Sequence, residues 1–240
     1  ISIDPNLSDL VYCVDGDTRE RNHFRYTQNQ RRKETKQKKY QNIILEYKEE
    51  TIDGKTIIEL ETETSFYNRK TLNIEEFKKY LKKKNEVNFK LFLFYKKQLF
   101  RKLKLNGYWN RLRSEQRMMN RFSKIFGKPT DAIICIGDFE QRKHRKFKEP
   151  IKGKGFRTLF RRNGYKVYLV DEFRTSCKCS NCEGGECSKF RKCRNPKPMK
   201  NNSILSHGVL MCKTCLALWN RDEKSSRNIY KIAYNAIHQN

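Results

Sequence analysis

The sequence predicts an α/β fold: a mixed sheet with flanking helices, interrupted by a cysteine-rich insertion. Three observations support this prediction. Residues 1–28 alternate short β-rich stretches with turns, which is typical of a three-strand meander. Residues 132–172 contain a strand, a helix and a second strand, a spacing that favours a crossover between parallel strands. Seven of the nine cysteines lie between residues 177 and 215, which is typical of local metal binding.

Charge and composition restrict the class of protein. The 54 Lys and Arg residues exceed the 27 Asp and Glu residues, giving a formal net charge of +27. Such a self-repelling charge indicates a polyanionic partner. Because 36% of the residues are hydrophobic, the chain can bury a core and is not a disordered basic tail. No apolar run reaches 18 residues, so no transmembrane helix is expected. The chain begins with Ile1 and has no initiator methionine or signal peptide, so we expect a truncated chain.

The region 30–126 is predicted to be a helical insertion. A basic helix starts near residue 30, a second covers about 74–84, and a longer one covers about 88–126 with an interruption at Gly107. Residues 51–65 give no clear pattern. The cationic faces of these helices are compatible with two roles, a solvated surface or a nucleic-acid contact.

Four elements are expected after the insertion. The apolar run 132–138 is typical of a strand buried on both faces. Residues 155–163 predict a short helix that ends at Gly164, and residues 165–172 predict the next strand. The segment from residue 220 onward has the most regular helical pattern in the chain, with one stripe formed by Ile229, Ile232, Ala233, Ala236 and Ile237.

Two C-x-x-C pairs predict a zinc site, formed by Cys179, Cys182, Cys212 and Cys215. Four sulfur ligands suit tetrahedral zinc and leave no open coordination position, so this zinc is expected to be structural. The 29 residues between the pairs exceed the usual spacing of about 15–20, which indicates an insertion. The remaining candidates, as alternative ligands or for a second ion, are Cys177, Cys187, Cys193 and His207.

Three acidic residues stand where the pattern predicts burial. Asp4 ends the first strand, Glu172 ends the strand 165–172, and Asp222 starts the last helix on the stripe of Ile229. Alternation places either Asp171 or Glu172, but not both, toward a common site. Each acid also has a simpler role: a turn residue, a partner for an arginine, or a helix-start residue favoured by the helix dipole. Three converging carboxylates would suit two Mg²⁺ ions and phosphodiester hydrolysis.

Several motifs together carry a family resemblance. They are residues 1–6 (ISIDPN), 25–32 (RYTQNQRR), 136–138 (IGD), 153–157 (GKGFR), 171–176 (DEFRTS), both C-x-x-C pairs, and 219–222 (WNRD). In this order they resemble the RuvC-like nuclease half of Fanzor proteins, the eukaryotic and giant-virus relatives of TnpB. The resemblance covers nearly the whole chain.

The resemblance implies an RNase H-like (RuvC) fold and an RNA-guided DNA endonuclease encoded by a transposable element. The implied domains are a RuvC-like nuclease domain over 1–176, a zinc-ribbon target-nucleic-acid-binding module over 177–219, and a final RuvC helix over 220–240. Asp4 and Asp222 correspond to the first and last catalytic aspartates. Gly137 occupies the position of a TnpB glutamate, and the displaced glutamate of Fanzor proteins is matched to Glu172; Asp138 and Glu140 remain candidates.

The resemblance also implies partners. These are a DNA target and a guide RNA, and the latter requires an N-terminal region beyond this sequence. The expected nucleic-acid-binding residues are Arg25, Gln28, Arg31, Arg32, Lys154, Arg157, Arg174 and Arg221. The expected location is intracellular, in the nucleus or in the host of a virus. Two other readings remain open: a catalytically inactive, transposon-derived zinc protein that binds nucleic acid, and a guide-free resolvase that acts on branched DNA.

Overall fold

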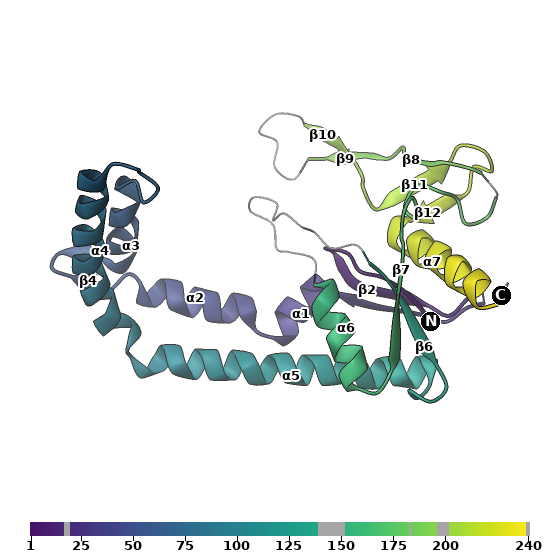
Figure 1. Ribbon diagram of the computed structural model, residues 1–240, viewed down its shortest axis with the longest axis horizontal. Coiled ribbons are helices and arrows are strands. Elements are labelled where there is room, and N and C mark those ends of the chain that lie inside the picture. The colour runs from purple at the N-terminus through teal and green to yellow at the C-terminus, as the bar shows by residue number, and fades with distance from the viewer. Residues whose placement is uncertain (17–19, 139–151, 183, 196–201, 239–240) are drawn as a thin grey trace. The chain divides into compact units, whose positions relative to one another are not determined.

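The computed structural model describes residues 1–16, 20–138, 152–182, 184–195 and 202–238 (Figure 1). The chain forms two compact units. The first combines Ile1–Arg31 with Glu115–Asn240, and the second is Arg32–Ser114. The second unit lies within the predicted helical insertion. Among the described residues, no helix combines the length and the apolar character that crossing a membrane requires.

A five-stranded mixed sheet organises the first unit. Its strands are β1 (Ser2–Asp4), β2 (Asp9–Val14), β3 (His23–Thr27), β6 (Ile133–Gly137) and β7 (Lys166–Val170), in the order β3-β2-β1-β6-β7. The first three strands form the predicted antiparallel meander, and β6 continues parallel to β1 and β7. The prediction of a mixed sheet with flanking helices is therefore confirmed.

The two faces of this sheet differ. On one face, Ile3, Val11 and Ile136 pack into a hydrophobic core with Phe122 and Phe160. These two aromatic residues come from α5 (Gln98–Phe126) and α6 (Gly153–Arg162). Because side chains alternate along a strand, Ser2 and Asp4 point to the other face.

The last helix, α7 (Arg221–His238), packs against β1 and β2 (Figure 1). Ser226 on this helix donates a hydrogen bond to the carbonyl of Tyr12 at 2.9 Å, and Ile229 is fully buried. The predicted stripe was partly wrong, since Ile232 and Ile237 are exposed. Polar and small residues line the first half of the buried face, which brings Asp222 close to the sheet.

The cysteine-rich region contains five short strands between the sheet and α7. They are β8 (Cys187–Lys189), β9 (Lys192–Arg194), β10 (Ser203–Leu205), β11 (Val209–Cys212) and β12 (Leu218–Asn220). Strands β12, β11 and β8 form one antiparallel sheet, and β9 pairs with β10 as a separate hairpin. This hairpin explains the long spacing between the two C-x-x-C pairs.

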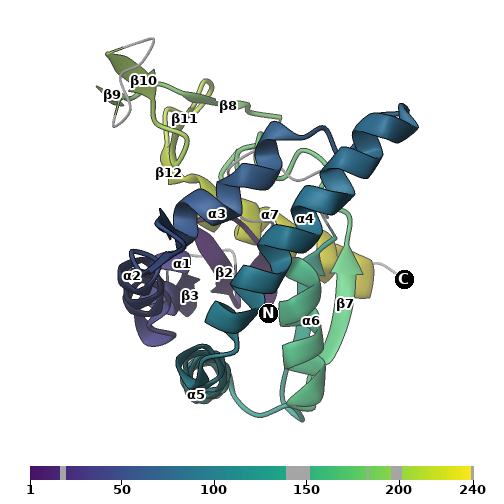
Figure 2. The same ribbon diagram turned by 90° about the vertical axis from the view of Figure 1, so that its left-hand side faces the viewer.

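The second unit consists mainly of helices (Figure 2). Its elements are α2 (Gln37–Tyr47), β4 (Thr51–Ile52), β5 (Lys55–Thr56), α3 (Ile57–Glu63), the 3-10 helix η1 (Thr64–Phe66) and α4 (Ile74–Tyr95), together with parts of α1 (Gln28–Glu34) and α5. Ile57, Leu60 and Phe94 form its small core.

The predicted helix boundaries in this region were wrong. The chain stays helical from Ile74 to Tyr95, and the break falls at Lys96 and Lys97 instead of near residue 85. The break allows the rings of Phe94 and Phe100 to pack with centroids 5.0 Å apart. Gly107 does not interrupt α5, since a single glycine costs only about 1 kcal/mol in a helix.

Candidate functional site

Four cysteines lie together between β11, β8 and the turn that follows Thr175. The Sγ atoms of Cys179 and Cys215 are 3.7 Å apart, and those of Cys182 and Cys212 are 3.6 Å apart. All four Sγ atoms lie within 4.8 Å of one another. A tetrahedral ion with metal–sulfur bonds of about 2.3 Å would separate its sulfurs by about 3.8 Å. The cluster therefore fits a tetrahedral metal such as zinc.

The local backbone supports the sulfur atoms. In each C-x-x-C turn a backbone N–H points at the first sulfur: Asn181 donates to Cys179 at 3.4 Å, and Cys215 donates to Cys212 at 3.5 Å. Gly185 lies directly against the cluster, because a Cβ atom at this position would come within 2.9 Å of the Cys212 sulfur. Sequence reasoning missed Gly185, since a single glycine among turn residues carries no distinct signal.

The four thiols differ in how readily they ionise. Burial opposes ionisation of Cys179, but the backbone N–H groups of Asn181 and Cys182 lower its pKa to about 6. The pKa of Cys182 rises to about 12, because its thiol hydrogen-bonds to Cys215 and burial adds to this effect. Four adjacent thiolates repel one another, and a divalent cation removes that repulsion. The residues present thus fit a metal ion.

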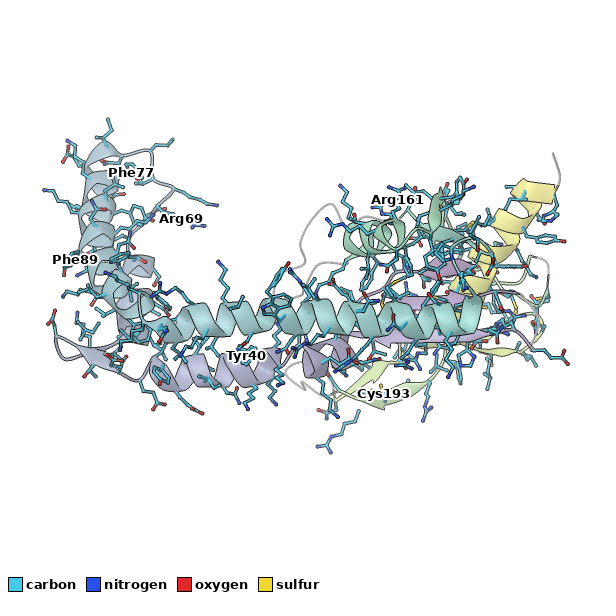
Figure 3. All side chains as sticks on the ribbon, turned by 90° about the horizontal axis from the view of Figure 1, so that it is seen from below. Tyr40, Arg69, Phe77, Phe89, Arg161 and Cys193 are labelled. Atoms are coloured by element: carbon cyan, nitrogen blue, oxygen red, sulfur yellow. The ribbon has the colours of Figure 1, made fainter. Side chains whose placement is uncertain are left out.

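The other candidate ligands lie outside this group. Cys193 is exposed on the hairpin of β9 and β10, and Cys177 is also exposed (Figure 3 labels Cys193). Cys187 stands opposite Cys212 in the pairing of β8 and β11. Among the described residues, only the four predicted cysteines bring three or more ligand atoms within 4.8 Å, so neither these cysteines nor His207 belongs to the group.

Asp4 is the central carboxylate of a second site. It lies at the end of β1, between β2 and β6, and is only 8% exposed. Burial raises its pKa well above the usual value, and the nearby carboxylates of Asp222 and Glu172 raise it further. The three predicted acids therefore lie close enough to interact. Their oxygens do not form a group as tight as the four sulfurs, among the residues described.

Asp222 is held at the start of α7. The Asn220 side chain accepts hydrogen bonds from the backbone N–H groups of Asp222, at 3.0 Å, and Glu223, at 3.4 Å, and so caps the helix. The Asn6 amide donates to the Asp222 carboxylate. Burial and the neighbouring Asp9 carboxylate raise the pKa of Asp222 to about 6. The WNRD motif thus supplies both the cap and the acid.

Glu172 lies against Gly137. A Cβ atom at Gly137 would come within 2.8 Å of the Glu172 side-chain carbon Cδ. Strand β7 ends at Val170, so the expected strand end at Glu172 was wrong, and the acid lies in the following turn. There the carbonyl of Glu172 accepts hydrogen bonds from Thr175.

The other acids considered for the role of Glu172 are Asp171, Asp138 and Glu140. Asp171 is exposed and its carboxylate accepts a hydrogen bond from the backbone N–H of Phe173 at 2.9 Å, as a turn residue does. Asp138 is exposed. Glu140 lies outside the described residues.

Asp9 is a fourth carboxylate that sequence reasoning missed. The register of β2 and β3 shifts between Asp9 and Val11, and both Leu10 and Val11 pack into the core. Because a bulge re-aims side chains, Asp9 moves to the face that carries Asp4 and Tyr12. There the Asp9 carboxylate is close enough to Asp222 to raise its pKa. An aspartate five residues after Asp4, at the start of a strand, was the available signal.

Arg25 binds this fourth carboxylate. Its Nη2 lies 3.0 and 2.9 Å from the two Asp9 oxygens, and its Nε lies 3.3 Å from Oδ1. The side chain of Asp9 is 5% exposed and that of Arg25 is 48% exposed. Arg25, expected to contact nucleic acid, is thus a partner of the carboxylate site.

The other expected nucleic-acid contacts have varied surroundings. Gln28 is buried, and Arg31 lies 4.0 Å from Glu115. Arg174 pairs with Glu186. Arg221 is near enough to lower the pKa of Asp4 and Asp222. The remaining three residues lie on helices, with Arg157 half-buried and Arg32 and Lys154 exposed.

Comparison with known proteins adds no assignment. No protein-family model matches this chain, and no curated protein matches it significantly.

Proposed function

We propose that this chain is a metal-dependent DNA endonuclease with an RNase H-like (RuvC) fold, of the RNA-guided Fanzor/TnpB type. The observation that carries the proposal is the position of Asp4, which is buried at the end of the central strand within electrostatic range of Asp222 and Glu172. The strand order β3-β2-β1-β6-β7, with the last helix packed against β1, supports the fold assignment.

The carboxylate site fits hard cations. Its donors are carboxylate oxygens, which Mg²⁺ prefers, and burial makes ionisation of Asp4 and Asp222 costly without a cation. Asp4, Glu172 and Asp222 would hold two Mg²⁺ ions. When bound, such a pair activates a water molecule and stabilises the leaving oxygen in phosphodiester hydrolysis.

The rest of the chain would bind nucleic acid. The net charge of +27 suits the phosphate backbone, and loss of a single phosphate contact would weaken binding without changing the preferred sequence. Zinc in the four-cysteine cluster would hold the region 177–219 in shape as a target-binding module. Target choice would come from base pairing with a guide RNA.

A second candidate function is nucleic-acid binding without cleavage. The observation that favours it is that the three carboxylates do not form a tight group, among the residues described, as the four cysteines do. This candidate keeps the zinc and the basic surface of the protein but assigns the acids a structural role.

Nicking of supercoiled DNA with Mg²⁺ or Mn²⁺ separates the two candidates. The wild-type chain is compared with the Asp4→Ala/Asp222→Ala variant, and Asp171→Ala serves as the control because Asp171 is an exposed turn residue. Cleavage should disappear only in the double variant, while DNA binding stays. If the wild type and the double variant bind DNA equally and neither cuts it when a guide RNA is supplied, the nuclease proposal fails.

A further inference from the structure

A lysine is buried beside the four-cysteine cluster. Lys224 lies on α7, two residues after Asp222, and its side chain is fully buried. Its Nζ donates a hydrogen bond to the carbonyl of Ser176 at 2.8 Å. Ser176 directly precedes Cys177, whose carbonyl accepts a hydrogen bond from the backbone N–H of Cys187 at 2.8 Å, and Cys187 stands opposite the cluster residue Cys212.

A buried ammonium group is costly unless an opposite charge lies nearby. No ion pair joins Lys224 to a carboxylate in the described parts of the chain. Ser180, which lies between Cys179 and Cys182, donates a hydrogen bond to the backbone carbonyl of Lys224 at 3.3 Å. The lysine therefore lies against a turn that supplies two of the four sulfurs.

Metal loading would provide that charge. Four thiolates and one divalent cation leave two negative charges on the cluster. We propose that Lys224 is the counter-cation of the metal-loaded four-cysteine cluster. Since Lys224 lies on α7, loading of the cluster then stabilises the attachment of the helix that carries Asp222.

Neutral hydrogen bonds attach the same two elements. Ser180 donates to the Asn228 side-chain oxygen at 2.7 Å, and the Asn228 amide donates to the carbonyls of Thr175 and Lys178, at 2.8 and 3.0 Å. These neutral hydrogen bonds alone attach the turn that holds Cys179 and Cys182 to α7. Lys224 adds a contribution that depends on the charge of the cluster.

Lys231 provides a matched control. It also lies on α7, and its Nζ donates to the carbonyl of Ser180 at 2.7 Å. Unlike Lys224, it is only partly buried. At either position, a Lys→Met change removes one such hydrogen bond and one positive charge. Of these two lysines, only Lys224 carries its charge in a fully buried place.

Zinc affinity tests the proposal directly. Wild type, Lys224→Met, Lys224→Gln and Lys231→Met are loaded with zinc and titrated with a chromophoric chelator. We expect both Lys224 variants to bind zinc about 10–100-fold more weakly, as for other residues that support metal ligands, and Lys231→Met to change affinity less than threefold. Affinity of the Lys224 variants equal to wild type, or lowered only as much as in Lys231→Met, would overturn the proposal.

Stability separates a charge role from a packing role. In the zinc-loaded chain, Lys224→Met should lower the urea midpoint. In the metal-free chain it should leave the midpoint unchanged or raise it, because an uncompensated buried charge is removed. An equal decrease in both states would show a packing role and contradict the proposal. If the metal-free chain does not fold, the chelator titration decides alone. Neither measurement requires nuclease activity. The outcome of this test is therefore independent of the proposed function.

Discussion

The Glu172 side chain lies directly against Gly137 of β6. The Glu172 carboxylate occupies the space that a side chain at Gly137 would fill, on the strand next to Asp4. A carboxylate can thus reach this part of the site from the turn after β7 only because residue 137 is a glycine. We predict that Gly137→Ala displaces Glu172 and lowers Mn²⁺ affinity about 10–100-fold, measured by isothermal titration calorimetry.

Two further variants sharpen this prediction. Gly155→Ala is the control, because a Cβ atom at that position of α6 meets nothing within 4 Å. Gly137→Glu combined with Glu172→Ala should recover part of the lost affinity, since it returns a carboxylate to the same space. Unchanged Mn²⁺ binding in Gly137→Ala would mean that Glu172 does not belong to the metal site.

Gly185 should be equally intolerant at the cysteine cluster. Its missing side chain leaves room for the sulfurs of Cys182 and Cys212. We predict that Gly185→Ala lowers zinc affinity at least tenfold, and that Gly208→Ala, where a Cβ atom meets nothing within 4 Å, does not. A Co²⁺-loaded Gly185→Ala chain should also show altered thiolate absorption bands. Spectra identical to wild type would rule out the crowding argument.

Local patterns predicted the features that depend on local chemistry. The alternation in residues 1–28 and the apolar run at 132–138 predicted strands, and the two C-x-x-C pairs predicted which cysteines gather. In each case a short stretch of sequence determines the geometry, through side-chain alternation or through a tight turn that aims two thiols at one point.

Long-range packing produced the features that the sequence did not reveal. The break at Lys96 and Lys97 accompanies packing of Phe94 on Phe100, and no Pro or Gly marks it in the sequence. The bulge at Asp9 depends on tertiary packing, because both Leu10 and Val11 of β2 pack into the hydrophobic core. The pairing of Arg25 with Asp9 joins two strands, so a pattern along one strand could not distinguish it from a phosphate contact.

The buried acids predict an unusual pH dependence of stability. Burial and Asp9 raise the pKa of Asp222 to about 6 in the folded chain, against an ordinary value of 3.8. The folded state therefore holds more protons between these values, and the stability that this group contributes is present below about pH 4 and lost as the pH rises through about 6. Asp4 acts in the same direction.

Urea unfolding of the zinc-loaded chain without Mg²⁺ measures this effect. Between pH 4.5 and 7.5, wild type should lose about 2 kcal/mol of unfolding free energy relative to Asp222→Asn, which cannot ionise. Saturating Mg²⁺ at pH 7.5 should remove most of the difference, because the cation takes the place of the protons. Parallel pH profiles for the two chains would argue against the burial of Asp222.

The pairing of Arg25 with Asp9 makes a prediction about DNA binding. When an arginine that contacts a phosphate is removed, the salt dependence of DNA binding becomes weaker. The slope of log K against log[salt] changes by about 0.9 for each lost contact. Arg25 uses its guanidinium on the buried Asp9 carboxylate instead. We therefore expect Arg25→Gln to leave the salt slope unchanged, and the exposed Lys154 to behave as a phosphate contact when changed to Gln.

Stability completes this comparison, because Arg25→Gln leaves Asp9 buried without its partner. The unfolding free energy should fall by about 1.5–3 kcal/mol, the range for a lost hydrogen bond to a charged group. Combining Arg25→Gln with Asp9→Asn should restore part of this loss, since the unpaired charge is then gone. If Arg25→Gln instead lowers the salt slope as Lys154→Gln does and leaves stability intact, Arg25 is a phosphate contact and Asp9 does not hold it.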